Sequence, residues 1–80
     1  MTMKEEDIKE HLLSGNPEFR HLSDEHKQHE SRLGELLGRQ HMTEQDHLEA
    51  ITLKKRKLYL KDQMNSMIQK FRNELSHQHT

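Results

Sequence analysis

The sequence predicts an all-α fold: an antiparallel, coiled-coil-like helical hairpin with a short N-terminal helix packed on the overhang of the long C-terminal helix. Three observations support this prediction. Valine is absent and no alternating run of β-branched residues occurs, so strand signals are nearly missing. The only proline and two of the three glycines fall at positions 15–17 and 38, and divide the chain into three segments. Within these segments apolar residues recur at a 3-4 spacing, which is typical of helices that bury one face.

The composition indicates a single helical domain over residues 1–80 and little material for a catalytic cleft. Only 29% of the residues are apolar, 34% are charged, and the net charge is −1. So few apolar side chains do not build both a core and a deep pocket. We therefore expect no enzymatic activity, no cofactor and no small-molecule substrate. The chain has no cysteine, no long apolar run and no secretion-signal pattern, so we expect a cytoplasmic protein outside the membrane.

The first helix is predicted at about residues 3–13. Thr2 followed three residues later by Glu5 is typical of a capping box at a helix N-terminus. Gly15 is suited to end this helix, because glycine commonly occupies the left-handed position that follows a last helical turn. The apolar side of this helix comprises Ile8, Leu12 and Leu13.

The second helix is predicted at about residues 17–37. Asn16 is a favourable N-cap, and Pro17 suits the first helical position, where its missing N–H leaves no hydrogen bond unmade. Gly38 ends this helix and opens the connection to the next one.

The third helix is predicted at about residues 44–75, with residues 76–80 as a frayed tail. Thr43 opens it, and Asp46 three residues later completes an imperfect capping box. Because no glycine or proline follows Thr43 within this range, we expect one continuous helix.

The second and third helices each carry one seam of apolar residues that polar residues interrupt near the middle. A short connection makes the two helices antiparallel, and the resulting register brings His26, His29 and Lys57 into one polar layer. We interpret this layer as a device that specifies the register at some cost in stability. In the same register Leu33 lies near Leu48 and Ala50. The seam residues are Phe19, Leu22, His26, His29, Leu33 and Leu36, then Ala50, Leu53, Lys57, Leu60, Met64, Met67 and Phe71.

The third helix is longer than the second, so its C-terminal part overhangs the hairpin. We expect the first helix to lie beside this overhang, with Ile8 and Leu12 covering Met67 and Phe71. The alternative is that the overhang pairs with a second copy of the chain. Residues 1–40 are net acidic and residues 41–80 net basic, which favours pairing across the hairpin. The expected pairs join Asp24, Glu25 and Glu30 to Lys54, Lys55 and Lys57.

Part of the sequence resembles a known family. The stretches concerned are Asn16-Pro17-Glu18-Phe19, Leu22, Asp24-Glu25-His26 and, above all, Leu53-Lys54-Lys55-Arg56-Lys57-Leu58-Tyr59-Leu60-Lys61-Asp62-Gln63-Met64. They resemble the YdcH-like family of short bacterial proteins, whose domain has no known function. The similarity covers about residues 5–70, and it implies a helical hairpin with no established enzymatic activity. Where that family usually has leucine after the first seam histidine, this chain has His29.

His26, His29 and Glu30 are the weak candidates for a metal site. Two imidazoles and a carboxylate at helical spacing can ligate zinc. However, Lys57 is the expected neighbour across the seam, and a cation there repels a metal ion. We therefore predict a structural polar layer with no resident metal, and a metal-responsive module is our second alternative.

The predicted function is that of an uncharacterised helical interaction or structural module that self-associates or docks to a helix of another protein. A small elongated hairpin buries little apolar surface, so such scaffolds often gain stability by assembling. The alternative is a nucleic-acid-binding accessory protein that uses the basic stretch 54–61, with Lys54, Lys55 and Arg56 contacting phosphates. No aromatic platform accompanies that stretch. The apolar residues expected on a second contact face are Leu37, Ile51, Leu58 and Ile68.

Overall fold

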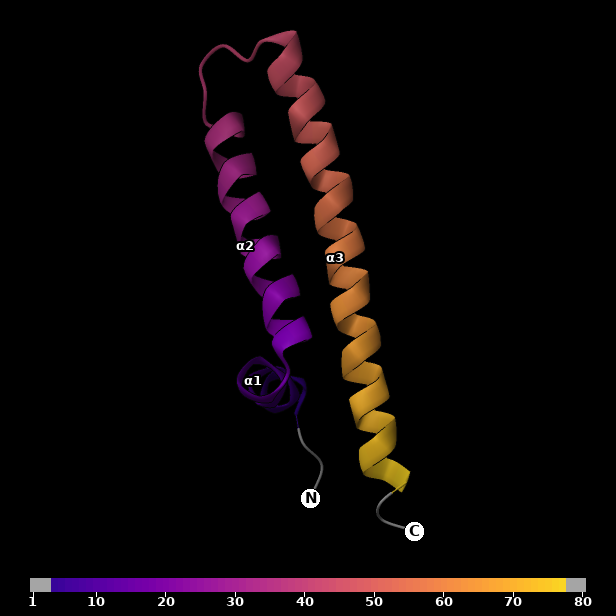
Figure 1. Cartoon of the computed structure of the whole chain (residues 1–80). Helices are drawn as coiled ribbons and strands as arrows, with labels where there is room; N and C mark the ends of the chain where they lie inside the picture. The colour runs from indigo at the N-terminus through magenta and orange to yellow at the C-terminus, as the bar shows by residue number, and fades with distance from the viewer. Residues whose placement is uncertain (1–3, 78–80) are drawn as a thin grey trace.

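The computed structural model describes residues 4–77 and, within them, three helices that form an elongated hairpin. α1 spans Glu5–Gly15, α2 spans Pro17–Leu37 and α3 spans Glu44–His77. α2 and α3 lie side by side and antiparallel, and α1 lies beneath the start of α2 (Figure 1). The molecule measures 57 × 20 × 17 Å along its principal axes. The predicted all-α hairpin is therefore confirmed.

α1 begins and ends two residues later than the sequence predicts. Lys4 is its N-cap residue, and the Lys4 backbone N–H donates a hydrogen bond to Asp7 Oδ2 at 3.2 Å. The expected cap, Thr2, lies outside the described residues. Gly15 is the last helical residue, and no φ among the described residues is positive, so the left-handed ending predicted at Gly15 is wrong. The chain instead leaves the helix through extended backbone at Asn16, with φ −125° and ψ 104°.

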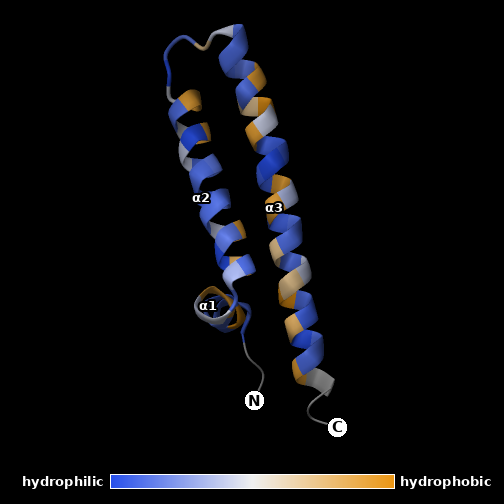
Figure 2. Ribbon diagram, viewed as in Figure 1, coloured by the Kyte–Doolittle hydropathy of each residue, from blue (hydrophilic) through white to orange (hydrophobic). Residues whose placement is uncertain are grey.

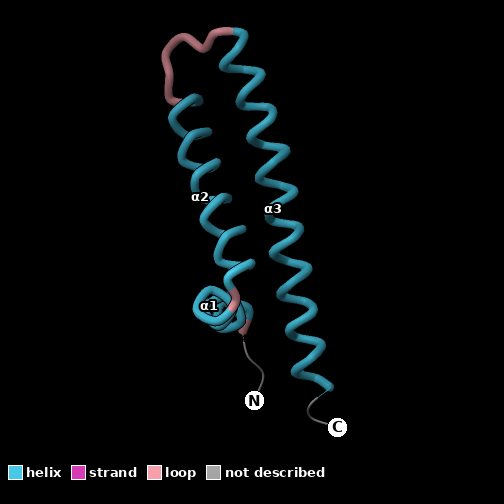
Figure 3. Tube along the Cα trace, in the orientation of Figure 1, coloured by secondary structure: helices cyan, strands magenta, loops and turns pink. Residues whose placement is uncertain are grey.

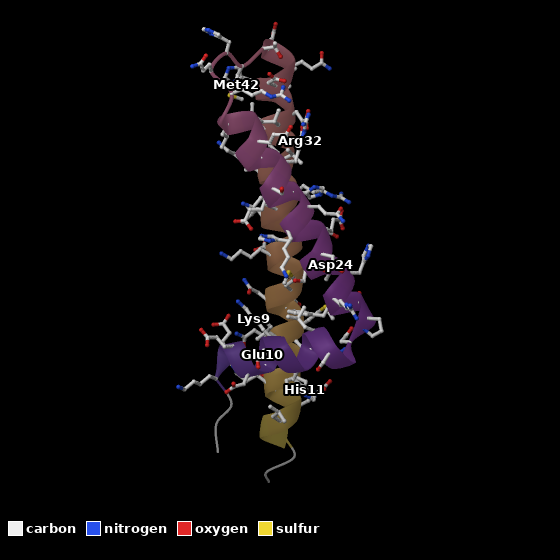
Figure 4. The ribbon with its side chains drawn as sticks, turned by 90° about the vertical axis from the view of Figure 1, so that its left-hand side faces the viewer. Lys9, Glu10, His11, Asp24, Arg32 and Met42 are labelled. Atoms are coloured by element: carbon white, nitrogen blue, oxygen red, sulfur yellow. The ribbon has the colours of Figure 1, made fainter. Side chains whose placement is uncertain are left out.

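A single residue, Asn16, joins α1 to α2. Its side-chain oxygen accepts a hydrogen bond from the Phe19 N–H at 3.1 Å, and Pro17 occupies the first helical position. Both features confirm the predicted start of α2. Because only one extended residue separates the two helices (Figure 3), α1 leaves α2 at a steep angle and crosses α3 (Figure 4). The N-terminal helix thus packs across the overhang and not along it.

The predicted capping box at the start of α3 is formed. The Asp46 N–H donates to Thr43 Oγ1 at 3.0 Å, and the Thr43 N–H donates to Asp46 Oδ2 at 3.1 Å. Arg39 Nη1, in the connection, donates to Asp46 Oδ1 at 3.0 Å. The backbone N–H of Thr43 and the guanidinium of Arg39 together lower the pKa of Asp46, because both stabilise its ionised form. Asp46 therefore links Arg39 of the connection to the first turn of α3 through hydrogen bonds.

α3 continues to His77, so residues 76 and 77, which the sequence predicts as a frayed tail, are helical. Neither glycine nor proline occurs between residue 44 and residue 77 to end the helix earlier. α2 ends at Leu37 with Gly38 as its C-cap, as predicted.

One apolar cluster lies near the connection. Leu33 and Leu36 of α2 pack with Ala50 of α3, and Met42 and Leu53 border them. These contacts confirm the predicted seam at this end of the hairpin.

A second cluster lies where α1 crosses the hairpin. Ile8 and Leu12 of α1 pack with Phe19 and Ile68, and α1 therefore covers the overhang of α3 as predicted. The exposed position predicted for Ile68 is wrong, because only 2% of it is accessible. Ile68 follows the α3 seam by one position, and the crossing α1 extends the core to that side. Partly buried residues around this cluster are Leu13, Met64, Met67 and Phe71.

Leu48 is 60% exposed and does not join the cluster of Leu33, where the sequence predicted it. Each helical step rotates the side chain by about 100°. Asp46 and Ala50, two positions away on either side, are both buried, so the intervening Leu48 points outward. Along the whole of α3, apolar residues are accordingly interspersed with polar residues (Figure 2).

Candidate interaction surface

The three residues predicted to form a polar layer, His26, His29 and Lys57, are each half-buried. His26 lines the groove beside α1 together with Lys61 and Met64. His29 Nε2 is 3.5 Å from Glu25 Oε1, and Lys57 Nζ is 3.9 Å from Glu30 Oε1. His29 Nε2 is buried and makes no hydrogen bond to another described residue. The carboxylates of Glu25 and Glu30 therefore lie beside these residues. Glu25 also takes part in one of the ion pairs described next.

Ion pairs across the hairpin specify which residues of α2 and α3 lie opposite each other. The Arg32 guanidinium donates from Nε (2.7 Å) and Nη2 (3.2 Å) to the two oxygens of Glu49. Arg56 Nη2 donates to Glu25 Oε1 at 3.0 Å. On each helix the glutamate precedes the arginine by seven residues. An antiparallel alignment therefore pairs opposite charges, whereas a parallel one would oppose like charges.

These contacts change the acidity of the two glutamates. The hydrogen bonds from Arg32 lower the pKa of Glu49, and those from Arg56 lower the pKa of Glu25, because each arginine stabilises the ionised carboxylate. The same pairing raises the pKa of Arg32. Both ion pairs are therefore present at neutral pH.

Acid should destabilise the hairpin. A carboxyl group with a lowered pKa in the folded state binds a proton more readily in the unfolded chain, whose carboxyl pKa is about 4. The stabilisation is complete above that value and is lost as pH falls through the lower folded pKa of Glu25, Asp46 and Glu49. We expect the melting temperature, followed by circular dichroism, to be lower at about pH 3 than at about pH 6.

The matched control for this prediction is the double variant Glu25→Gln, Glu49→Gln. It should melt below the native chain at about pH 6 and show a smaller further loss at about pH 3, because two of the responsible carboxylates are gone. Equal melting temperatures of the native chain at the two pH values would contradict the prediction.

The basic stretch is partly neutralised by α2. Arg56, expected to be free for a partner, is paired with Glu25. Lys54 and Lys55 are exposed and form no ion pair with any described side chain, and the same holds for Asp24. The ion pairs predicted between Asp24 and these two lysines are therefore not formed. All three predicted cations are exposed, but only Lys54 and Lys55 make no ion pair with a described side chain.

Two further classes of site find no support in the part of the chain that the structure describes. His26, His29 and Glu30 do not converge, since no three histidine, aspartate or glutamate side chains there are placed to hold a metal ion. Among the same residues, no helix has the length and apolar character needed to cross a bilayer.

The junction of the three helices leaves a groove of about 280 Å³. Its lining includes the charged residues Lys9 and Lys61 and the apolar residues Leu13, Met64 and Ile68. The same apolar side chains pack α1 against α3. We therefore assign this groove to the packing of α1.

Most of the exposed large apolar side chains among the described residues lie in a stripe on the outer face of α3, opposite the seam. Leu48 is 60% exposed, Ile51 51%, Leu58 62% and Tyr59 56%. At about 100° per residue, these four side chains fall within roughly a third of the helix circumference. We call them the outer α3 stripe.

The sequence predicts two members of the outer α3 stripe, Ile51 and Leu58, and misses the other two. The sequence predicts Leu48 near Leu33 in the core, and it assigns Tyr59 to no contact face. The 3-4 spacing that identifies the seam also runs through Leu48, Ile51, Lys55 and Leu58 on the opposite side of α3. That second periodicity is the signal that would have found the stripe. Leu37, 52% exposed, lies at the end of α2 and outside the stripe.

Comparison with known proteins identifies a family and no activity. A family model described as "Protein of unknown function (DUF465)" matches residues 19–68. No curated protein and no solved structure shows significant similarity to the chain. The matched range includes α2 from Phe19 onward, the connection and the whole outer α3 stripe.

Proposed function

This chain belongs to the DUF465 family, the YdcH-like family of small proteins of unknown function, and we propose that it serves as a helical interaction module with no catalytic role. The outer α3 stripe is its docking surface. The observation that carries the proposal is the exposure of four large apolar side chains, each more than half accessible, on one face of one helix. Lys55 lies between Ile51 and Leu58 on this face, so the apolar side chains form two pairs beside a charged residue. Exposed apolar side chains that gather on one face and are edged by polar residues commonly mark a protein interaction site.

The shape of the stripe favours a helix as the docking partner. Side chains at 3-4 spacing form ridges along a straight helix, and such ridges fit the grooves between the side chains of another helix. Both α1 and α2 lie on the other side of α3, so this face is uncovered over its length in the hairpin (Figure 1). The ion pairs between α2 and α3 hold α3 in place and present the stripe on a supported surface.

Nucleic-acid binding through residues 54–61 is the alternative function. Its support comes from Lys54 and Lys55, which are exposed and unpaired among the described residues. The pairing of Arg56 with Glu25 reduces the free positive charge of the stretch. A binding signal that falls steeply with salt and disappears in a Lys54→Gln, Lys55→Gln variant would favour this alternative.

Cross-linking inside the native cell tests the docking role. A photoreactive residue placed at Leu58 should give a discrete protein adduct, because this position lies at the centre of the proposed contact. The matched control is the same residue placed at Gln28, which is exposed on the middle of α2. We expect no discrete adduct at Gln28. Equal adducts at the two positions, or none at Leu58, would contradict the proposal.

A further inference from the structure

Leu58 and Tyr59, at the C-terminal end of the outer α3 stripe, form a single patch with two neighbouring charged residues. Lys55, Leu58, Tyr59 and Asp62 occupy positions i, i+3, i+4 and i+7 of α3, which adjoin one another on a helix surface. All four are exposed. Neither Lys55 nor Asp62 makes an ion pair with another described residue. A cation and an anion therefore flank two apolar side chains, and all of them are available for contact.

This patch is complementary to itself. A two-fold rotation about an axis between Leu58 and Tyr59 places Leu58 of one copy over Tyr59 of the other. The same rotation brings Lys55 of each copy opposite Asp62 of the other, which gives two identical ion pairs. We propose that the occupant of the outer α3 stripe is a second copy of this chain, whose α3 packs antiparallel on this patch. The inference rests on the proposed docking function and names its partner.

The hairpin itself shows that two helices with this charge pattern pair opposite charges when they run antiparallel. Glu25 and Arg32 of α2, seven residues apart, pair with their opposites on α3 because the two helices are antiparallel. Lys55 and Asp62 are also seven residues apart, on the opposite face of α3. A parallel second copy would oppose Lys55 with Lys55 and Asp62 with Asp62, which is repulsive. The antiparallel arrangement removes both repulsions and gives a closed two-fold dimer.

The size of the patch predicts a weak dimer. About two helical turns of each α3 take part, so the buried area lies below that of standard stable interfaces. We therefore expect a dissociation constant of about 10⁻⁵ to 10⁻⁴ M. Sedimentation equilibrium of the full chain over about 5–500 µM covers this range.

Charge reversal tests the pairing. Lys55→Glu alone and Asp62→Lys alone each convert both ion pairs of the dimer into repulsive contacts, so each should weaken association by about tenfold or more. An equimolar mixture of the two variants should restore association to about the native level. In the mixed dimer the new glutamate meets the new lysine, and the native Lys55 meets the native Asp62. Circular dichroism of each variant should show native helix content, because both positions are exposed.

Three results would overturn the inference. The first is a native chain that stays monomeric over the whole concentration range. The second is association that neither single variant weakens, and the third is a mixture that associates no better than its components. In each of these cases a discrete adduct with a different protein at Leu58 would preserve the docking function, whereas the absence of any adduct would remove it as well.

Discussion

Replacing Phe19 by alanine should lower the free energy of unfolding by about 3–5 kcal/mol. Phe19 is fully buried, and it packs with Ile8, Leu12 and Ile68, so its ring joins all three helices. Removing the ring takes away its apolar burial and leaves a cavity that the surrounding helices fill only in part. A chain of this size has a net stability of only several kcal/mol. The variant should therefore be largely unfolded at 25 °C.

Urea denaturation followed by circular dichroism measures this effect. Tyr59→Ala is the matched control, because it also removes an aromatic ring from a helix but at a position that is 56% exposed. At a protein concentration where the chain is monomeric, the control should lose less than about 1 kcal/mol. Similar losses for the two variants would show that Phe19 does not hold the three helices together.

Replacing Ile68 by alanine should lower the free energy of unfolding by about 2–5 kcal/mol. Ile68 is 2% exposed and packs with Ile8 and Leu12 of α1. The loss of packing should affect α1 most, since Ile68 is one of the few α3 side chains in the cluster that contains Ile8 and Leu12. We expect proteolysis within α1 to become faster along with the drop in stability.

Ile51→Ala provides the matched control on the same helix. Ile51 is 51% exposed, so the same change of side chain should cost less than about 1 kcal/mol in the monomer. Thermal melting of the two variants side by side gives the comparison. Equal melting temperatures for Ile68→Ala and Ile51→Ala would show that α1 does not cover Ile68 and that this side chain is exposed, as the sequence predicts.

The local signals of the sequence predict the helices well. Asn16 before Pro17, and Thr43 three residues before Asp46, place the starts of α2 and α3, because a cap satisfies backbone groups within its own turn. The 3-4 spacing likewise predicts the seam that packs α2 on α3. Such features depend on residues close in sequence or on one helix facing one partner.

The features that sequence reasoning misses depend on a third element. Ile68 is buried because α1 crosses α3, and the angle of that crossing follows from the single extended residue Asn16. Periodicity along α3 describes one buried face and cannot show that a second helix widens it. The burial of Asp46 similarly requires Arg39, which the connection brings to the start of α3.

The sequence predicts only part of the candidate site, because the contacts there also depend on how separate helices pack together. Net charge shows that α2 and α3 attract, but it does not choose between neighbouring cations, and the structure pairs Glu25 with Arg56 in place of the lysines. Leu58 was expected on a second contact face, and the structure adds Tyr59 beside it. Which side chains reach each other depends on their angular positions around two packed helices.

A pair of variants separates the folding face of α3 from its docking face. Leu58→Ala truncates the most exposed side chain of the outer α3 stripe, and Leu60→Ala truncates a neighbour that is only 1% exposed. Melting and sedimentation should be measured for both. We predict that Leu60→Ala unfolds at a lower temperature, whereas Leu58→Ala melts like the native monomer and loses association. A Leu58→Ala variant that melts as low as Leu60→Ala, or that associates like the native chain, would contradict the assignment of the outer face to docking.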